Sequence, residues 1–247
     1  SNLKSKIIFI KEFYQFDKFL GKSISNLTVE NLKKDIFIIV LSPWKLTAVN
    51  WFSITVGLML LKRGKNVRFL IDDLIFENRI DHCLQIVTIN KTLKLLIKKG
   101  VVVEKLSDFK SKAILNIHET EEIEKLAFAN AVHFNRGEDY TDEFNQLIVE
   151  NKIRYETNFT TVKNYIEKYP ASDYIIPGGV IANSGLFVSI LKKKNCSFFT
   201  YDSGFGVMIT CFKGIAAQLA DIPITFDAIF SNKEELEYAI IASKEEL

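Results

Sequence analysis

Unbroken apolar runs, separated by amphipathic segments, are the feature that most restricts the fold of this chain. Residues 36–41 read IFIIVL and residues 67–71 read VRFLI, without regular alternation between apolar and polar positions. Strands of this kind are buried on both faces, which is typical of parallel sheets. A third run occupies residues 197–201. We therefore expect these three runs to be neighbouring parallel strands.

Apolar residues at helical spacing fill the intervals between the runs. Residues 50–63 form one such segment, and Gly64 closes it as a C-cap residue would. The same reasoning predicts further strands at 101–103, 113–117, 173–176 and 222–229, and further helices at 79–99, 119–134, 141–169 (in two pieces), 183–194, 213–220 and 234–247. Strands alternating with helices predict an α/β, Rossmann-like, doubly wound and largely parallel sheet with helices on both faces.

The chain is long enough for a sizeable core, and we expect one such domain over residues 35–247. Residues 1–34 form a prelude that packs on this domain, with a helix that Gly21 ends. The three cysteines are far apart and odd in number, which fits neither a disulfide framework nor a metal site and is usual in the reducing cytoplasm. The net charge of +2 does not indicate the clustered basic residues that nucleic-acid binding would need. No apolar stretch qualifies as a transmembrane segment, and peripheral contact with a membrane stays open.

Several phosphate and nucleophile motifs are missing. The loop after the first strand is SPWKLTAVNW and lacks the glycines of GxGxxG, which disfavours a dinucleotide site there. GxxxxGK[ST] and GxSxG do not occur either, so a P-loop and the usual hydrolase elbow are excluded. We accordingly expect no tightly bound cofactor.

The candidate site lies at the carboxyl ends of the strands, where ligands bind in open α/β sheets. Five segments follow predicted strands and should meet at that edge. The candidate catalytic residues in them are Asp202 and His118. The candidate substrate-binding residues are Trp44, Lys45, Asp72, Gly178, Gly179, Asn183, Ser184, Ser203 and Gly204. Glycines permit close approach of a ligand, and free N–H groups at a helix start favour anions or hydroxyls.

Each candidate also has a purely structural interpretation. Asn183, Ser184 and Asp72 are all residues that commonly cap helices. The segment after residue 201 suits a polyol or phosphate but could equally be a flexible turn. His118 beside Glu119 could act as a base, or could simply begin a helix.

One family resembles this layout. The opening segment, IFIIVLSPWKLTAVNWFSITVGLMLLKRGKNVRFLIDD, looks like the first βαβ unit of GT-B glycosyltransferases, including the Leu60–Val67 stretch LLKRGKNV. The later segments DYIIPGGVIANSGL and SFFTYDSGFG resemble strand ends of the same N-terminal half, as in bacterial enzymes of surface-polysaccharide synthesis. The resemblance covers roughly residues 35–230, and βαβ units in general share its local motifs.

The resemblance implies an acceptor-binding half-enzyme. Such a piece would bind a glycan or lipid-linked acceptor and supply a catalytic base, while a C-terminal domain would bind the nucleotide-sugar donor. Without that second domain we expect no sugar transfer. Two alternatives stay open, a non-catalytic Rossmann-like module that binds a glycan or a partner protein, and a small-molecule enzyme of Rossmann type complete in itself. The sugar, acceptor, linkage and oligomeric state do not follow from the residues.

Overall fold

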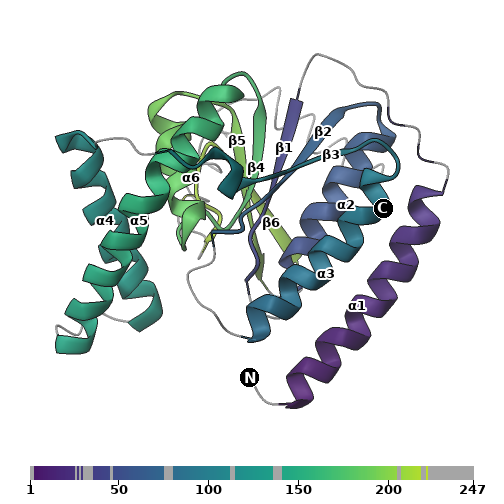
Figure 1. The fold of residues 1–247 in the computed structure, drawn as a ribbon, viewed down its shortest axis with the longest axis horizontal. Helices are drawn as coiled ribbons and strands as arrows, with labels where there is room; N and C mark the ends of the chain where they lie inside the picture. The colour runs from purple at the N-terminus through teal and green to yellow at the C-terminus, as the bar shows by residue number, and fades with distance from the viewer. Residues whose placement is uncertain are drawn as a thin grey trace, which may run out of the picture.

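The computed structural model describes residues 3–25, 27, 29, 36–44, 47–74, 80–111, 115–135, 141–204, 207–217 and 221. Figure 1 shows a central sheet with helices packed around it. The helices are α1 Leu3–Ile24, α2 Val49–Lys62, α3 Ile80–Ile97, the 3₁₀-helix η1 Leu106–Phe109, α4 Ile117–Asn135, α5 Asp142–Lys168 and α6 Asn183–Lys193. The strands are β1 Ile36–Leu41, β2 Asn66–Ile71, β3 Val102–Lys105, β4 Asp173–Pro177, β5 Phe198–Gly204 and β6 Val207–Phe212.

The six strands form one sheet in the order β3-β2-β1-β4-β5-β6. All neighbouring pairs are parallel except β5 and β6, which form an antiparallel pair. The expected α/β, Rossmann-like, mostly parallel sheet is therefore confirmed. The chain winds outward from β1 to β3 and then crosses back to β4 on the other side of β1. A topological switch point thus lies between β1 and β4.

The three apolar runs are not all neighbours. β1 and β2 pair in register from Ile36 with Asn66 to Leu41 with Ile71, as expected. The run at 197–201 lies one strand further away, because β4 inserts between β1 and β5. Strand order depends on the long crossover through α4 and α5, and no local pattern reports where that crossover returns.

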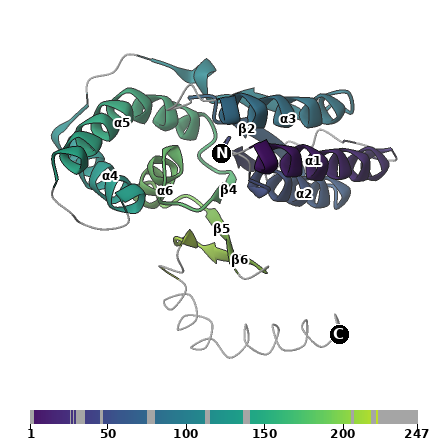
Figure 2. The same cartoon turned by 90° about the horizontal axis from the view of Figure 1, so that it is seen from below.

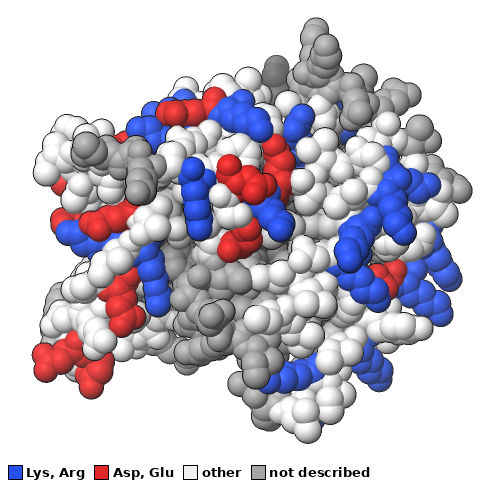
Figure 3. Space-filling view, in the orientation of Figure 1, with Lys and Arg blue, Asp and Glu red and all other residues white. Residues whose placement is uncertain are grey.

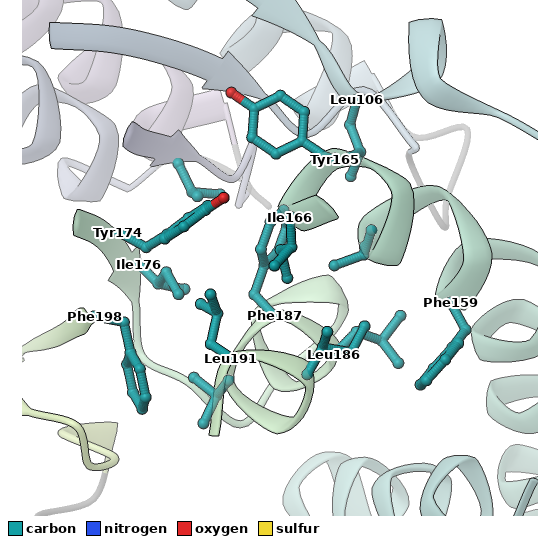
Figure 4. Packing of buried hydrophobic residues seen from close by; sticks show 14 of the residues in the cluster. Leu106, Phe159, Tyr165, Ile166, Tyr174, Ile176, Leu186, Phe187, Leu191 and Phe198 are labelled. Carbon is teal, nitrogen blue, oxygen red and sulfur yellow. The ribbon is translucent and has the colours of Figure 1, made fainter. Parts of the chain in front are cut away.

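Helices cover both faces of the sheet, as Figure 2 shows. Successive residues of β1 point to opposite faces, as in any strand. Ile39 and Leu41 belong to a buried cluster with residues of α1, α2 and α3. Ile38 and Val40 belong to a second cluster with residues of α4, α5 and α6, part of which Figure 4 shows. This double burial is the physical reason for the unbroken apolar runs.

The strand expected at 113–117 is wrong over its described end. Ile117 is the first residue of α4, and residues 113 and 114 lie outside the described residues. Asn116 starts the helix because its side-chain Oδ1 accepts the Glu119 N–H at 3.0 Å, while Glu119 Oε2 accepts the Asn116 N–H at 3.0 Å. This reciprocal pair is a capping box. The Asn-x-x-Glu spacing was a signal in the sequence for a helix start.

Three further expectations differ from the structure. The segment 141–169 is one continuous helix, α5, rather than two pieces. The expected helix at 213–220 does not begin at Lys213, whose φ of 53° lies outside the helical region, and residues 213–216 are not helical, although residue 217 lies in a 3₁₀ turn. α1 runs through Gly21 to Ile24, since Leu20 and Ile24 are both buried in the core and hold the last turn in place. The segments expected at 222–229 and 234–247 lie outside the described residues.

Two helical glycines test how tightly α2 packs on the sheet. A Cβ added at Gly57 would overlap the ring of Phe69, whereas a Cβ added at Gly21 would meet no atom within 4 Å. Gly57→Ala should lower the free energy of unfolding by about 1–2 kcal/mol, because overpacking outweighs the gain in helix propensity. Gly21→Ala should raise it by about 0.5–1 kcal/mol. Urea denaturation of both variants measures these changes. If the free energy of unfolding changed in the same direction in both variants, the packing of α2 against Phe69 would be contradicted.

Candidate functional site

The carboxyl ends of β1, β2 and β4 meet at the switch point. The Asp72 N–H donates to Leu41 O at 2.9 Å, and the Gly178 N–H donates to Tyr201 O at 2.7 Å. These bonds extend the ladder by one residue beyond each strand. Ser42, Asp72 and Gly178 therefore lie in one row along the edge of the sheet.

A buried carboxyl group stands at one end of this row, after β2. Asp72 is only 5% exposed, and its Oδ1 accepts a hydrogen bond from Asn183 Nδ2 at 2.8 Å. Asn183 Oδ1 in turn accepts from Asn158 Nδ2 of α5 at 3.1 Å. Burial raises the pKa of Asp72 to about 7, despite the Asn183 hydrogen bond, which favours the ionised form. This carboxyl group can therefore take up or release a proton close to neutral pH.

The loop from β4 to α6 is tightly folded beside this carboxyl. Gly178 and Gly179 have φ values of 67° and 98°, which side chains rarely adopt. A Cβ at Gly178 would lie 3.0 Å from the ring of Trp44, so the indole packs directly against the loop backbone. Ala182 also has a positive φ, of 51°, and its N–H donates to Asn130 Oδ1 at 3.3 Å. A non-glycine residue in this region is strained, and such strain is concentrated at ligand sites.

Four buried polar atoms around this edge have no hydrogen-bond partner among the residues that the structure describes. They are Ser42 Oγ, Trp44 Nε1, Asn50 Oδ1 and Ser184 Oγ. Asn50 lies at the start of α2 and uses its Nδ2 to donate to Ser42 O at 2.7 Å. Unpaired buried polar atoms are uncommon in proteins because each one costs desolvation energy. Each of these four atoms could form a hydrogen bond with a hydroxyl group of a ligand or with water.

The expected segment after residue 201 extends this row within a strand, over its described residues, and not as a loop. Asp202 lies within β5, half-buried, and pairs with Ile209 of β6. Ser203 and Gly204 also belong to β5 and are therefore not part of the expected loop, and the Ser203 side chain is not described. By strand alternation Asp202 points to the same face as Thr200, whose methyl group lies against Gly179. Because Pro177 pairs with Tyr201, the next residue, Asp202, lies beside Gly178 and continues the row onto β5.

His118 is placed away from the sheet edge. It lies in the first turn of α4, with its side chain 85% exposed and Nδ1 3.7 Å from Glu121 Oε2. Figure 2 shows α4 and α5 together on the side of the molecule away from α1. Lys45 lies outside the described residues. Asp73, the neighbour of Asp72, is committed to η1, where it accepts hydrogen bonds from the N–H and hydroxyl groups of Ser107.

The sequence interpretation missed the polar groups that come from helices. Asn50, Asn130 and Asn158 are buried at 0%, 4% and 7% exposure, and all three contact the strand-end segments. An asparagine within an apolar helical stretch, as at Asn50, was the one visible signal. Asn130 and Asn158 lie in segments rich in polar residues, where a buried asparagine looks like an exposed one.

Comparison with known proteins leaves the site geometry as the main guide. No protein-family model matches this chain, and no curated protein matches it. Within the described part of the chain, His, Cys, Asp and Glu side chains do not gather in the groups of three that could hold a metal ion. The helices described are too short or too polar to cross a bilayer.

Proposed function

We propose that this chain is the acceptor-binding domain of a GT-B type glycosyltransferase, in which the switch-point edge holds a glycan or lipid-linked acceptor. The observation that carries the proposal is the buried Asp72 carboxyl beside four unpaired buried polar atoms. The sheet order and the switch point match the place where doubly wound folds bind ligands.

The chemistry of the edge suits a polyhydroxyl ligand. A sugar hydroxyl both donates and accepts, so it can pair with the serine hydroxyls, with the Asn50 carbonyl oxygen or with the Trp44 indole N–H. A phosphate group would need backbone N–H groups or cations. The described residues directly after β1 offer little of this, because Pro43 has no N–H and the Trp44 N–H already donates to Ser42 O at 2.8 Å. Beside the end of β1, neutral sugar hydroxyls are therefore favoured over a phosphate.

Asp72 is the group we propose as the base. It would accept the proton of the acceptor hydroxyl while that oxygen bonds to the anomeric carbon of the donor sugar, and the nucleoside diphosphate would leave with the electron pair of the broken bond. A pKa of about 7 keeps the carboxyl ready to accept a proton near neutrality. Asn183 would hold the carboxyl in place. Asp202 stays a second candidate, since it lies on the adjacent strand beyond Gly178.

The donor would bind to a second domain, and the two halves together would perform transfer. A non-catalytic glycan-binding module remains the alternative, because the same hydroxyl-rich edge would serve it equally well. Titration with nucleotide-sugars tests a third possibility, that the chain is a complete enzyme by itself. Tight donor binding or turnover by residues 1–247 alone would show a complete enzyme and would refute the half-enzyme proposal.

Removing single hydroxyls tests the acceptor site. Ser42→Ala and Ser184→Ala should each weaken sugar binding by about 3–10-fold, the contribution of one hydrogen bond. Their free energy of unfolding should stay equal or rise slightly, because neither lost hydroxyl has a hydrogen-bond partner within the described part of the chain. NMR titration of wild type and variants with mono- and disaccharides measures the affinity, and urea denaturation measures stability.

Ser25→Ala is the matched control. Ser25 is exposed at the end of α1, where its hydroxyl donates only to Lys22 O. This variant should bind sugar as the wild type does. Chemical-shift changes confined to the amino-terminal ends of the strands, around Asn66 and Asp173, would rule out the switch-point edge as the sugar site.

A further inference from the structure

α1 is held in one rotational orientation by its aromatic face. Phe9 and Phe16 stack on Trp51 of α2, with ring centroids 5.1 Å and 5.6 Å apart. Phe13 joins them in a small buried cluster, and Leu20 continues the same face into the main core. The outward face of α1 is therefore determined by packing rather than by chance.

An exposed apolar stripe runs along this outward face. Leu3, Ile7, Ile10 and Tyr14 are 74%, 57%, 49% and 68% exposed. Their spacing of four, three and four residues places them on one side of the helix. Isolated exposed apolar residues are ordinary, but a contiguous row of large ones marks a contact surface. We call these four residues the α1 stripe.

A row of lysines lies directly beside the α1 stripe. Lys4, Lys11, Lys18 and Lys22 are all exposed and repeat at seven, seven and four residues, which again is one side of the helix. Over its whole length α1 carries five lysines and only two acids, Glu12 and Asp17. Asp17 already pairs with Lys91 of α3 at 2.9 Å. The exposed face of α1 is thus apolar along one line and basic along the next.

The positive charge extends beyond α1, although the chain as a whole is nearly neutral. Figure 3 shows Lys and Arg gathered on the right-hand side, over α1 and α3, with few Asp or Glu among them. Six more exposed basic residues add to the positive charge of α1. They lie in or directly after α3 and around the end of α2: Lys62, Arg63, Lys65, Lys91, Lys94 and Lys98. The opposite side carries the acidic α4, with four glutamates against one lysine. The net charge of +2 conceals this asymmetry.

We propose that α1 lies on the surface of an anionic lipid bilayer, with its stripe in the headgroup region and its lysine row on the lipid phosphates. A helix with an apolar line and a basic flank has the composition of interfacial helices. Juxtaposed lysines gain about 1 kcal/mol each near an anionic leaflet. Nucleic acid would engage the lysines but not the stripe, and so fits the surface less well. This inference does not depend on the sugar site.

Vesicle co-sedimentation of the full 247-residue chain tests the proposal. The wild type should bind vesicles of phosphatidylcholine mixed with phosphatidylglycerol, should not bind pure phosphatidylcholine, and should bind more weakly at higher salt. Ile7→Ser with Ile10→Ser, and separately Lys11→Glu with Lys18→Glu, should each reduce the affinity by at least about tenfold. These side chains are exposed, so circular dichroism should show unchanged folding.

Val149→Ser with Ile153→Ser is the matched control, because these α5 residues are 57% and 58% exposed and lie on the acidic hairpin. That pair should leave vesicle binding unchanged. The proposal is overturned by a wild type that ignores anionic vesicles, or by α1 variants that bind as well as the wild type. Sedimentation showing a dimer that only the α1 variants break would instead assign the stripe to a second copy. Tighter binding to duplex DNA than to vesicles would assign the lysine row to nucleic acid.

Discussion

Asp72→Asn is expected to stabilise the protein at pH 8 and to weaken sugar binding in the same variant. The Asp72 carboxyl is buried, and its folded-state pKa of about 7 stands above the ordinary value of 3.8. The folded protein therefore holds a proton that the unfolded chain releases between these two values. Stability from this group is fully present below about pH 4 and is lost as the pH rises towards 7. The full loss is on the order of 4 kcal/mol.

An asparagine stays neutral at every pH and avoids this loss. An asparagine side chain has only one accepting oxygen, whereas a carboxyl group has two, so the hydrogen bond from the Leu74 backbone is lost. We subtract about 1 kcal/mol from the expected gain in stability for this bond. The variant should then be about 3 kcal/mol more stable than wild type at pH 8 and no more stable at pH 4. Urea denaturation across this pH range measures the difference, and NMR titration with sugars measures the accompanying loss of binding.

Asp108→Asn serves as the control, because Asp108 is exposed in η1. It should keep the wild-type dependence of stability on pH, since the buried carboxyl is still present. If Asp72→Asn left that dependence unchanged, burial would not raise the pKa of Asp72, and the expected stabilisation at pH 8 would be wrong. If it removed the dependence but left sugar binding intact, the carboxyl would serve the fold alone.

Phe187→Ala should cost about 3–5 kcal/mol of unfolding free energy, the usual range for removing a buried aromatic ring. Phe187 is fully buried, and Figure 4 shows it in the middle of the cluster that joins α6 to the sheet and to α5. α6 begins with Asn183 and Ser184, so loosening it should also weaken sugar binding. Urea denaturation and the same NMR titration record both effects.

Two control variants should have smaller effects on stability than Phe187→Ala. Phe134→Ala removes a ring that is 59% exposed at the end of α4 and should change stability by less than about 0.5 kcal/mol. Phe187→Leu keeps most of the buried volume and should cost under about 1.5 kcal/mol. An equal loss for Phe187→Ala and Phe134→Ala would contradict the packing of α6 against the sheet.

Local patterns were enough to locate most elements. The run at 36–41 and the segments closed by Gly64 and Gly100 became strand and helices within a few residues of the expected bounds. Their success has a simple cause, since burial on both faces and helical spacing are properties of neighbouring residues. The prediction of a strand at 113–117 was wrong because it relied on a short apolar run and did not use the capping-box signal at Asn116.

The candidate site divides in the same way. Position after a strand was enough to point to Asp72, Gly178 and Asn183, and the structure places all three at the switch point. The same rule also selected His118, which lies on α4 because its presumed strand is the start of a helix. Whether these side chains bind a sugar stays a prediction for the experiments above.

By itself the sequence determined the fold class, most strands and helices, and the polar residues that follow the strands. Only the tertiary structure decided that β4 lies between β1 and β5, and that Asp72 is buried against Asn183, 111 positions further along the chain. Only the tertiary structure, too, decided that α1 turns its stripe and its lysine row outward. These outcomes depend on contacts between distant segments, whose free energies no local pattern of residues contains.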